Sequence, residues 1–287
     1  MRYLGVIGHP LKRSLSPFFQ QAAIDQLGLD IVYEAWPTTE EGLAARVKGL
    51  RAPAVLGANV TIPHKEAALA LVDEVDDLAR KVGALNTIAN REGLLRAYNT
   101  DVAGFLRALR DDAGFDPAGR RAVIAGAGGA ARAVVVALCQ AGATSITVIN
   151  RTPERAAKLV ADLRSVAEHT VLDALSAGGA AWAAAVSGCD LLVNCTSVGS
   201  AGSAEESESP VPVDVIHPGM LVYDLIYRPA ETPLLAAARG RGAQVLGGLP
   251  MLIYQGAESF RIWTGREAPA GIMLAAAQKA LAEEAGR

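Results

Sequence analysis

Residues 122–155 constrain the fold more than any other part of the chain. A short apolar run ends at Ala125, the turn Gly126-Ala-Gly128-Gly-Ala-Ala131 follows, and residues 130–141 then contain no Pro or Gly. This order predicts a buried strand, a tight turn and a helix. The turn fits G-x-G-x-x-A, in which glycines let a pyrophosphate approach the backbone at a helix N-terminus. The stretch is therefore typical of a dinucleotide-binding unit, although the motif alone also occurs as an ordinary tight turn.

The end of the next predicted strand, residues 145–149, indicates which dinucleotide binds. NAD-binding units usually place Asp or Glu there, to hold the ribose 2′-hydroxyl. Here the strand is followed by Asn150-Arg151-Thr152-Pro153-Glu154-Arg155, with Thr152 as the predicted N-cap of a helix. A cation in a first helical turn opposes the helix dipole, so the two guanidiniums favour a bound 2′-phosphate. Two solvated arginines are the alternative, and the pattern favours NADP.

Composition excludes several classes of protein. The 287-residue chain has a formal net charge of −3, which gives nucleic acid no basic surface to bind. It has no uninterrupted apolar run of ~18 residues, so no membrane span is expected. The three cysteines and four histidines are scattered, so neither a disulfide framework nor a metal site is predicted. We expect a cytoplasmic protein with a small-molecule substrate, and the monomer and the homodimer both stay open.

Strands and helices alternate along the whole chain, which predicts an α/β fold with mainly parallel sheets. We expect two domains, because residues 102–245 contain the glycine-rich turn and form a Rossmann-type unit. Residues 1–101 have strands of their own, and residues 246–287 supply helices to cover that sheet. The active site is expected in the cleft between the domains. Residues 170–182 lack a clear pattern, and the acidic stretch 200–210 is expected to be a surface loop without a binding role.

Ser14 and Ser16 lie before a predicted helix, residues 18–27. Their hydroxyls suit a ligand carboxylate at the helix N-terminus. The alternative is that Ser16 only caps the helix, with Pro17 at its first position.

Another polar group follows the predicted strand 54–61, which ends in Asn59 and Thr61. Lys65 is expected to open the next helix, where a cation is unfavourable for stability. Either Lys65 is simply exposed or it has a function, because ligands of such sheets bind at the carboxyl ends of strands. Asp101 similarly begins a predicted helix, where an acidic residue is favourable by itself.

In this combination and order, the motifs resemble those of the shikimate dehydrogenase family over nearly the whole chain. The matching motifs are Gly8-His-Pro10…Ser14-Leu-Ser16-Pro17, Asn59-Val-Thr61-Ile-Pro63-His-Lys65, Gly83-Ala-Leu-Asn86-Thr87, Asn99-Thr100-Asp101, Gly126–Ala130, Asn150–Arg155, Asn194-Cys-Thr-Ser-Val-Gly199, Tyr223-Asp-Leu-Ile-Tyr227, Thr232-Pro-Leu and Met251-Leu-Ile-Tyr-Gln255…Trp263-Thr-Gly265. The resemblance implies NADPH-dependent, reversible reduction of 3-dehydroshikimate to shikimate, a step of aromatic amino-acid biosynthesis.

The resemblance also implies residue roles. Lys65 is implied as the proton-transfer residue, with Asp101 beside it. The implied substrate contacts are Ser14 and Ser16 to the carboxylate, and Asn59, Thr61, Asn86, Asp101, Tyr227 and Gln255 to the ring hydroxyls. The implied NADP contacts are Gly126, Ala127, Gly128, Gly129, Ala130, Asn150, Arg151, Thr152, Arg155, Leu225 and Gly248. Asp77 is a further implied contact near the cofactor, and its match to the family pattern is weaker.

The sequence departs from the family pattern at four positions, His9, Cys195, Ser200 and Pro250, of which Ser200 and Pro250 put cofactor affinity in doubt. Two other functions compete with the first. A quinate/shikimate dehydrogenase that uses NAD is disfavoured by Ser16 and Arg151. A non-catalytic NADP-binding regulator is disfavoured because Lys65 and Asp101 are both present.

Overall fold

The computed structural model describes residues 1–12 and 14–285, which form two compact units. Unit 1 comprises Met1–Gly104 and Leu252–Arg287, and unit 2 comprises Phe105–Met251. The division falls within two helices, α4 (Asp101–Arg107) and α9 (Leu249–Thr264), a few residues from the expected boundaries. Each unit has its own sheet and is described by itself.

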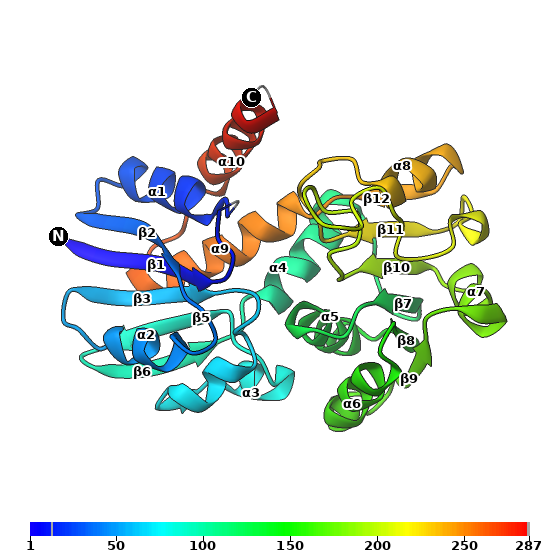
Figure 1. Cartoon of the computed structure of the whole chain (residues 1–287), viewed down its shortest axis with the longest axis horizontal. Coiled ribbons are helices and arrows are strands. Elements are labelled where there is room, and N and C mark those ends of the chain that lie inside the picture. The colour runs from blue at the N-terminus through cyan, green and yellow to red at the C-terminus, as the bar shows by residue number, and fades with distance from the viewer. Residues whose placement is uncertain (13, 286–287) are drawn as a thin grey trace. The chain divides into compact units, whose positions relative to one another are not determined.

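Unit 1 contains a six-stranded sheet in the order β2-β1-β3-β5-β6-β4 (Figure 1). Its strands are β1 (Arg2–Gly8), β2 (Ile31–Pro37), β3 (Val55–Val60), β4 (Glu74–Val75), β5 (Thr87–Arg91) and β6 (Leu94–Tyr98). Strand β1 runs parallel to β2 and β3, whereas β5 is antiparallel to β3 and β6. Strands β5 and β6 therefore form a hairpin.

Helices α1 (Ser16–Gln26), α2 (Leu43–Gly49), α3 (Asp77–Val82), α9 and α10 (Ala270–Ala285) cover this sheet, with a 3-10 helix at Ala67–Leu71. Helix α1 packs against α10. It also contacts α9, where Gln20 Nε2 donates to the Gly256 carbonyl at 2.9 Å. A Cβ on Gly256 would lie 2.5 Å from the Phe19 ring, so only glycine allows this approach. The C-terminal helices thus pack within unit 1.

Unit 2 contains a six-stranded, wholly parallel sheet in the order β12-β11-β10-β7-β8-β9. Its strands are β7 (Arg121–Ala125), β8 (Ser145–Asn150), β9 (Val171–Ser176), β10 (Leu191–Asn194), β11 (Leu221–Asp224) and β12 (Gln244–Leu246). Its helices are α5 (Gly129–Gln140), α6 (Pro153–Leu163), α7 (Gly179–Ser187) and α8 (Pro233–Gly240), with a π-helical segment at Ala108–Asp112 and 3-10 helices at Arg164–Val166 and Val213–Val215. This is the doubly wound arrangement that the glycine-rich turn predicted.

The structure corrects several local expectations. Residues 170–182, which lacked a clear pattern, form β9 and the start of α7. Strand β9 lies at the edge of the sheet and its side chains are only partly covered, so its hydrophobic periodicity is weak. Lys65 lies in a turn before the 3-10 helix instead of opening an α-helix. The N-cap of α1 is Leu15, one residue before the expected Ser16, and no side chain caps that helix.

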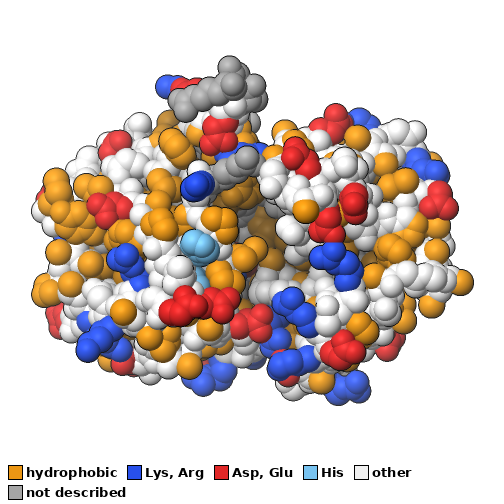
Figure 2. Space-filling model, in the orientation of Figure 1, with side chains coloured by type: hydrophobic (Ala, Val, Ile, Leu, Met, Phe, Trp, Pro, Cys, Tyr) orange, Lys and Arg blue, Asp and Glu red, His pale blue; other side chains and the backbone are white. Residues whose placement is uncertain are grey.

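Figure 2 shows basic and acidic side chains interspersed over the face that it draws. Among the described residues, no helix is long and apolar enough to cross a membrane. No group of three or more His, Cys, Asp or Glu side chains in that part of the chain could hold a metal ion.

Candidate active site

A partly buried ion pair in unit 1 joins the two residues implied as catalytic. Lys65 Nζ lies 2.5 Å from Asp101 Oδ2, and the two side chains are 15% and 5% exposed. Asp101 is the first residue of α4, and its backbone N–H donates to Asn99 Oδ1 at 3.1 Å. Lys65 is held by its carbonyl, which accepts from the Leu85 N–H at 2.8 Å. The backbone on both sides of the pair is therefore fixed.

Amide and hydroxyl groups of Asn86, Thr100 and Gln255 surround this ion pair. Asn86 Nδ2 contacts Asp101 Oδ1 at 2.8 Å and Gln255 Oε1 at 3.1 Å. It also contacts Thr100 Oγ1 at 2.8 Å. Asn86 follows α3, whose last turn ends at Gly83 with a left-handed φ of 69°. The network therefore gathers the predicted residues Asn86, Asp101 and Gln255 around the lysine.

A second polar group lies where β1 and β3 end and α1 begins. The Tyr33 hydroxyl donates to Asn59 Oδ1 at 2.7 Å and also hydrogen-bonds the Ser16 side chain. Burial raises the pKa of Tyr33 well above its usual value, so this phenol stays protonated and can donate. Ser14 Oγ accepts from the Ser16 N–H at 3.4 Å, and the Thr61 N–H bonds the Ile7 carbonyl at 2.8 Å. The predicted carboxylate and hydroxyl contacts thus share one end of the sheet.

The sequence did not single out four polar residues of this network as site residues: Tyr33, Thr87, Thr100 and Ser259. Ser259 Oγ lies 3.0 Å from Asn59 Nδ2, 2.7 Å from Thr87 Oγ1 and 3.1 Å from Thr100 Oγ1. The available signal was its spacing, because Ser259 follows Gln255 by one helical turn on α9. It joins the two groups of predicted residues.

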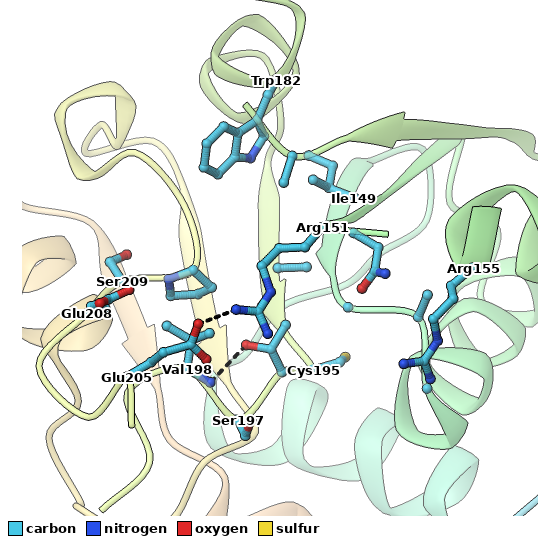
Figure 3. A pocket seen from close by; sticks show the side chains of 18 residues that line it. Ile149, Arg151, Arg155, Trp182, Cys195, Ser197, Val198, Glu205, Glu208 and Ser209 are labelled. Atoms are coloured by element: carbon cyan, nitrogen blue, oxygen red, sulfur yellow. Dashed lines mark hydrogen bonds and ion pairs between the residues drawn. The ribbon is translucent and has the colours of Figure 1, made fainter. Parts of the chain in front are cut away.

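In unit 2, a cavity of about 340 Å³ opens at the ends of β7 and β8 (Figure 3). Six predicted cofactor residues line it: Gly126, Ala127, Gly128, Asn150, Arg151 and Arg155. Gly126 has φ +109°, and a Cβ there would lie 3.1 Å from the Cys195 carbonyl atoms. The glycine therefore lets the first turn pass close to the segment after β10. Gly128 is the N-cap of α5, so the positive end of that helix lies at the cavity.

The other predicted cofactor residues do not line this cavity. Gly129 and Ala130 are inside the first turn of α5, and Thr152 is the N-cap of α6. Leu225 and Gly248 are packed together, since a Cβ on Gly248 would lie 2.0 Å from the Leu225 carbonyl oxygen. Tyr227 follows in the same segment of unit 2. Asp77 is exposed in the first turn of α3, in unit 1. The roles of these residues stay predictions.

The acidic stretch 200–210 is a loop of turns, as its composition predicted, and part of it also lines the unit 2 cavity. Glu205, Glu208, Ser209 and Pro210 line the unit 2 cavity, and Arg151 forms an ion pair with Glu205. The composition did not indicate that the loop folds back onto the cavity, because a run of small, polar and acidic residues carries no signal of its contacts. Its ends are fixed by backbone bonds, from Gly199 N–H to the Glu205 carbonyl at 2.9 Å and from Ala201 N–H to the Arg228 carbonyl at 2.9 Å.

Beneath the cavity, Asp224 anchors the loops that shape it. Its carboxylate accepts from Asn194 Nδ2 at 2.9 Å and from Thr232 Oγ1 at 2.7 Å. Asn194 Oδ1 in turn accepts from the Thr196 N–H at 2.9 Å, and Thr196 lines the cavity. Thr232 caps α8, accepting from the Leu235 N–H at 3.2 Å.

This buried carboxyl predicts a pH dependence of stability. Burial raises the pKa of Asp224 to about 6. Because the pKa of Asp224 is higher in the folded than in the unfolded state, the folded state binds more protons between about pH 4 and 6. The free energy of unfolding therefore falls by about 3 kcal/mol as the pH rises through that window. We expect Asp224→Asn to flatten the pH dependence of the free energy of unfolding there, measured by urea denaturation. Equal slopes for both proteins would contradict this.

Comparison with known proteins identifies the family of this chain. Three family models match the chain: the shikimate dehydrogenase substrate binding domain at residues 6–88, shikimate/quinate 5-dehydrogenase at 111–218, and the shikimate 5′-dehydrogenase C-terminal domain at 248–278. The shikimate dehydrogenase (NADP(+)) of Moorella thermoacetica is 47% identical over 283 residues, 99% of this chain and 95% of that one. The chain belongs to the shikimate dehydrogenase family.

Solved structures of the family share the fold. The shikimate 5-dehydrogenase of Thermus thermophilus, in complex with NADP(H) and shikimate, has a TM-score of 0.86 and 41% identity, covering 98% of this chain and 100% of that one. The quinate dehydrogenase of Corynebacterium glutamicum, in complex with NAD, has a TM-score of 0.88 and 28% identity, covering 97% and 99%. The family fold thus accommodates both dinucleotides.

Proposed function

We propose that this chain catalyses the reversible reduction of 3-dehydroshikimate to shikimate with NADPH, in the pathway to the aromatic amino acids. The partly buried Lys65–Asp101 pair carries the proposal, because it places a proton donor within a cluster of groups suited to a polyhydroxylated ring. Membership of the family supports the reaction, and unit 2 supplies a cavity suited to a dinucleotide. Bound NADPH supplies the hydride for the carbonyl carbon.

Lys65 is the proton donor in this proposal. As the carbonyl is reduced, negative charge develops on its oxygen, and Lys65 Nζ transfers a proton to that oxygen. Asp101 orients the ammonium group through their ion pair and, as an acceptor, also contacts the substrate. In the reverse direction Lys65 removes the proton from the alcohol.

The polar residues of unit 1 hold the substrate in this proposal. Ser14 and Ser16 bind the carboxylate at the start of α1, and the ring hydroxyls bind Asn59, Thr61, Asn86, Asp101, Gln255 and, from unit 2, Tyr227. Hydrogen bonds among these groups fix their positions, so a ligand lacking a hydroxyl would leave the donors and acceptors meant for it without a partner. This arrangement favours a narrow choice of substrate.

The cavity of unit 2 fits NADP(H) in the proposal. Gly126, Ala127 and Gly128 lie at the N-terminus of α5, where a pyrophosphate is stabilised. Arg151 and Arg155 lie at the end of β8 and in the first turn of α6, where they suit a 2′-phosphate. Asn150, Thr152, Gly129 and Ala130 complete this contact set, with Leu225 and Gly248 at the nicotinamide and Asp77 as the weakest member.

The activity is tested with the purified chain, NADPH and 3-dehydroshikimate. We expect NADPH absorbance to fall only when both are present, with shikimate as the product by chromatography. Oxidation of NADPH without shikimate formation would contradict the proposal. We also propose a homodimer in the cytoplasm; light scattering of the purified chain and localisation of a tagged chain test these two points.

A further inference from the structure

The cofactor cavity of unit 2 contains an acidic residue facing the predicted phosphate clamp. Arg151 extends from the end of β8 and forms an ion pair with Glu205 of the loop 200–210 (Figure 3). The Glu205 side chain is 25% exposed, whereas that of Arg151 is 75% exposed. In the same view Arg155 lies on α6, away from this pair. The carboxylate therefore occupies one of the two guanidiniums expected to bind the 2′-phosphate.

The charges around the cavity reinforce this point. Its lining contains Arg151 and Arg155 but also Glu205 and Glu208, so the two cations are matched by two anions. The strand end itself carries Asn150 in place of the acid that NAD-binding units usually have. Here the carboxylates come instead from a loop more than fifty residues later in the chain.

We infer that Glu205 is a specificity-determining residue that weakens the preference of this enzyme for NADP over NAD by occupying Arg151. This inference rests on the proposed NADP site. A carboxylate and a phosphate bind guanidinium through the same charge-assisted hydrogen bonds, so they compete for Arg151. Bound NADP must displace Glu205 or tolerate its charge, whereas NAD, which has no 2′-phosphate, incurs neither cost.

The test is equilibrium binding of NADP+ and NAD+ to the full chain by isothermal titration calorimetry. We expect Glu205→Gln to tighten NADP+ binding about fivefold, the upper end for a partly exposed ion pair, and to leave the Kd for NAD+ within twofold. Glu208→Gln removes the same charge from the cavity but keeps the ion pair of Arg151 with Glu205, so its effect should be smaller. Glu168→Gln changes the charge of unit 2 at an exposed position outside the cavity and should leave both Kd values unchanged.

A double-mutant cycle tests whether the effect passes through Arg151. In an Arg151→Ala background, Glu205→Gln should no longer tighten NADP+ binding. The inference is overturned if Glu205→Gln leaves the ratio of the two Kd values within twofold of wild type. It is also overturned if Glu205→Gln tightens NADP+ binding as much in the Arg151→Ala background as in the wild-type chain. Shikimate turnover of the wild-type chain is measured in parallel. Wild-type turnover with an unchanged Kd ratio rejects the inference alone, whereas a wild-type chain that binds neither cofactor rejects the proposed function and the inference together.

Discussion

Replacing Lys65 by alanine should lower kcat about 1000-fold, within the range of roughly 10²–10⁴ expected for loss of a positioned general acid. In the proposed mechanism Lys65 is the proton donor, and its ammonium group lies 2.5 Å from Asp101 in a cluster of polar groups that suit the substrate. The proton must then come from water, which is less well placed. Steady-state kinetics of shikimate oxidation with NADP+ measures the effect.

Two controls separate chemistry from folding in this experiment. Removing Lys65 leaves Asp101 buried without its cation, so the melting temperature of the variant must be compared with that of wild type. Binding of NADP+ by calorimetry should change little, because Lys65 lies in unit 1 and the predicted phosphate clamp lies in unit 2. Lys81→Ala, an exposed lysine of α3, is the matched variant and should keep wild-type kcat. A folded Lys65→Ala protein with normal turnover would remove Lys65 from the mechanism.

Replacing both Arg151 and Arg155 by alanine should lower the NADP-to-NAD ratio of kcat/KM about 100-fold, since each charge-assisted hydrogen bond contributes roughly 1.5–3 kcal/mol and both side chains are partly solvated. The change should appear with NADP+ alone, because NAD+ has no group for these guanidiniums to bind. Because Glu205 engages Arg151, we expect Arg155→Ala alone to have the larger of the two single effects.

The matched control for the arginine variants is Arg164→Ala, which removes an exposed cation of unit 2 outside the cavity. It should leave the ratio at its wild-type value. An unchanged ratio in the double variant would show that the two arginines do not bind the 2′-phosphate. A double variant that loses activity with NAD+ as strongly as with NADP+ would instead indicate damage to the fold.

Local sequence signals predicted the parts of the fold that depend on local chemistry. The order of strand, glycine turn and helix at residues 121–140 is confirmed, because a buried parallel strand and a helix N-terminus each leave a distinct pattern. Helix α8 likewise begins at a local signal, with Thr232 as its N-cap and Pro233 in its first turn. Strand β9 was missed because, at the edge of the sheet, its side chains are not buried on both faces.

The site was predictable only in part for a related reason. Lys65, Asn86, Asp101 and Gln255 were named in the sequence, but their convergence depends on pairing of strands and on α9, far away in the chain. Ser259 was missed because a single serine in a helix carries no local signal. Glu205 was missed because loop composition does not show which side chain a loop returns to, and its contact with Arg151 exists only in the folded unit.

The most direct test of the proposed reaction is a four-way rate assay with shikimate or quinate as substrate and NADP+ or NAD+ as acceptor, followed by nicotinamide absorbance. We expect the fastest turnover with shikimate and NADP+, slower turnover with shikimate and NAD+, and little with quinate. Quinate turnover as fast as that of shikimate would indicate a quinate/shikimate dehydrogenase. No turnover in any of the four combinations would contradict the catalytic account.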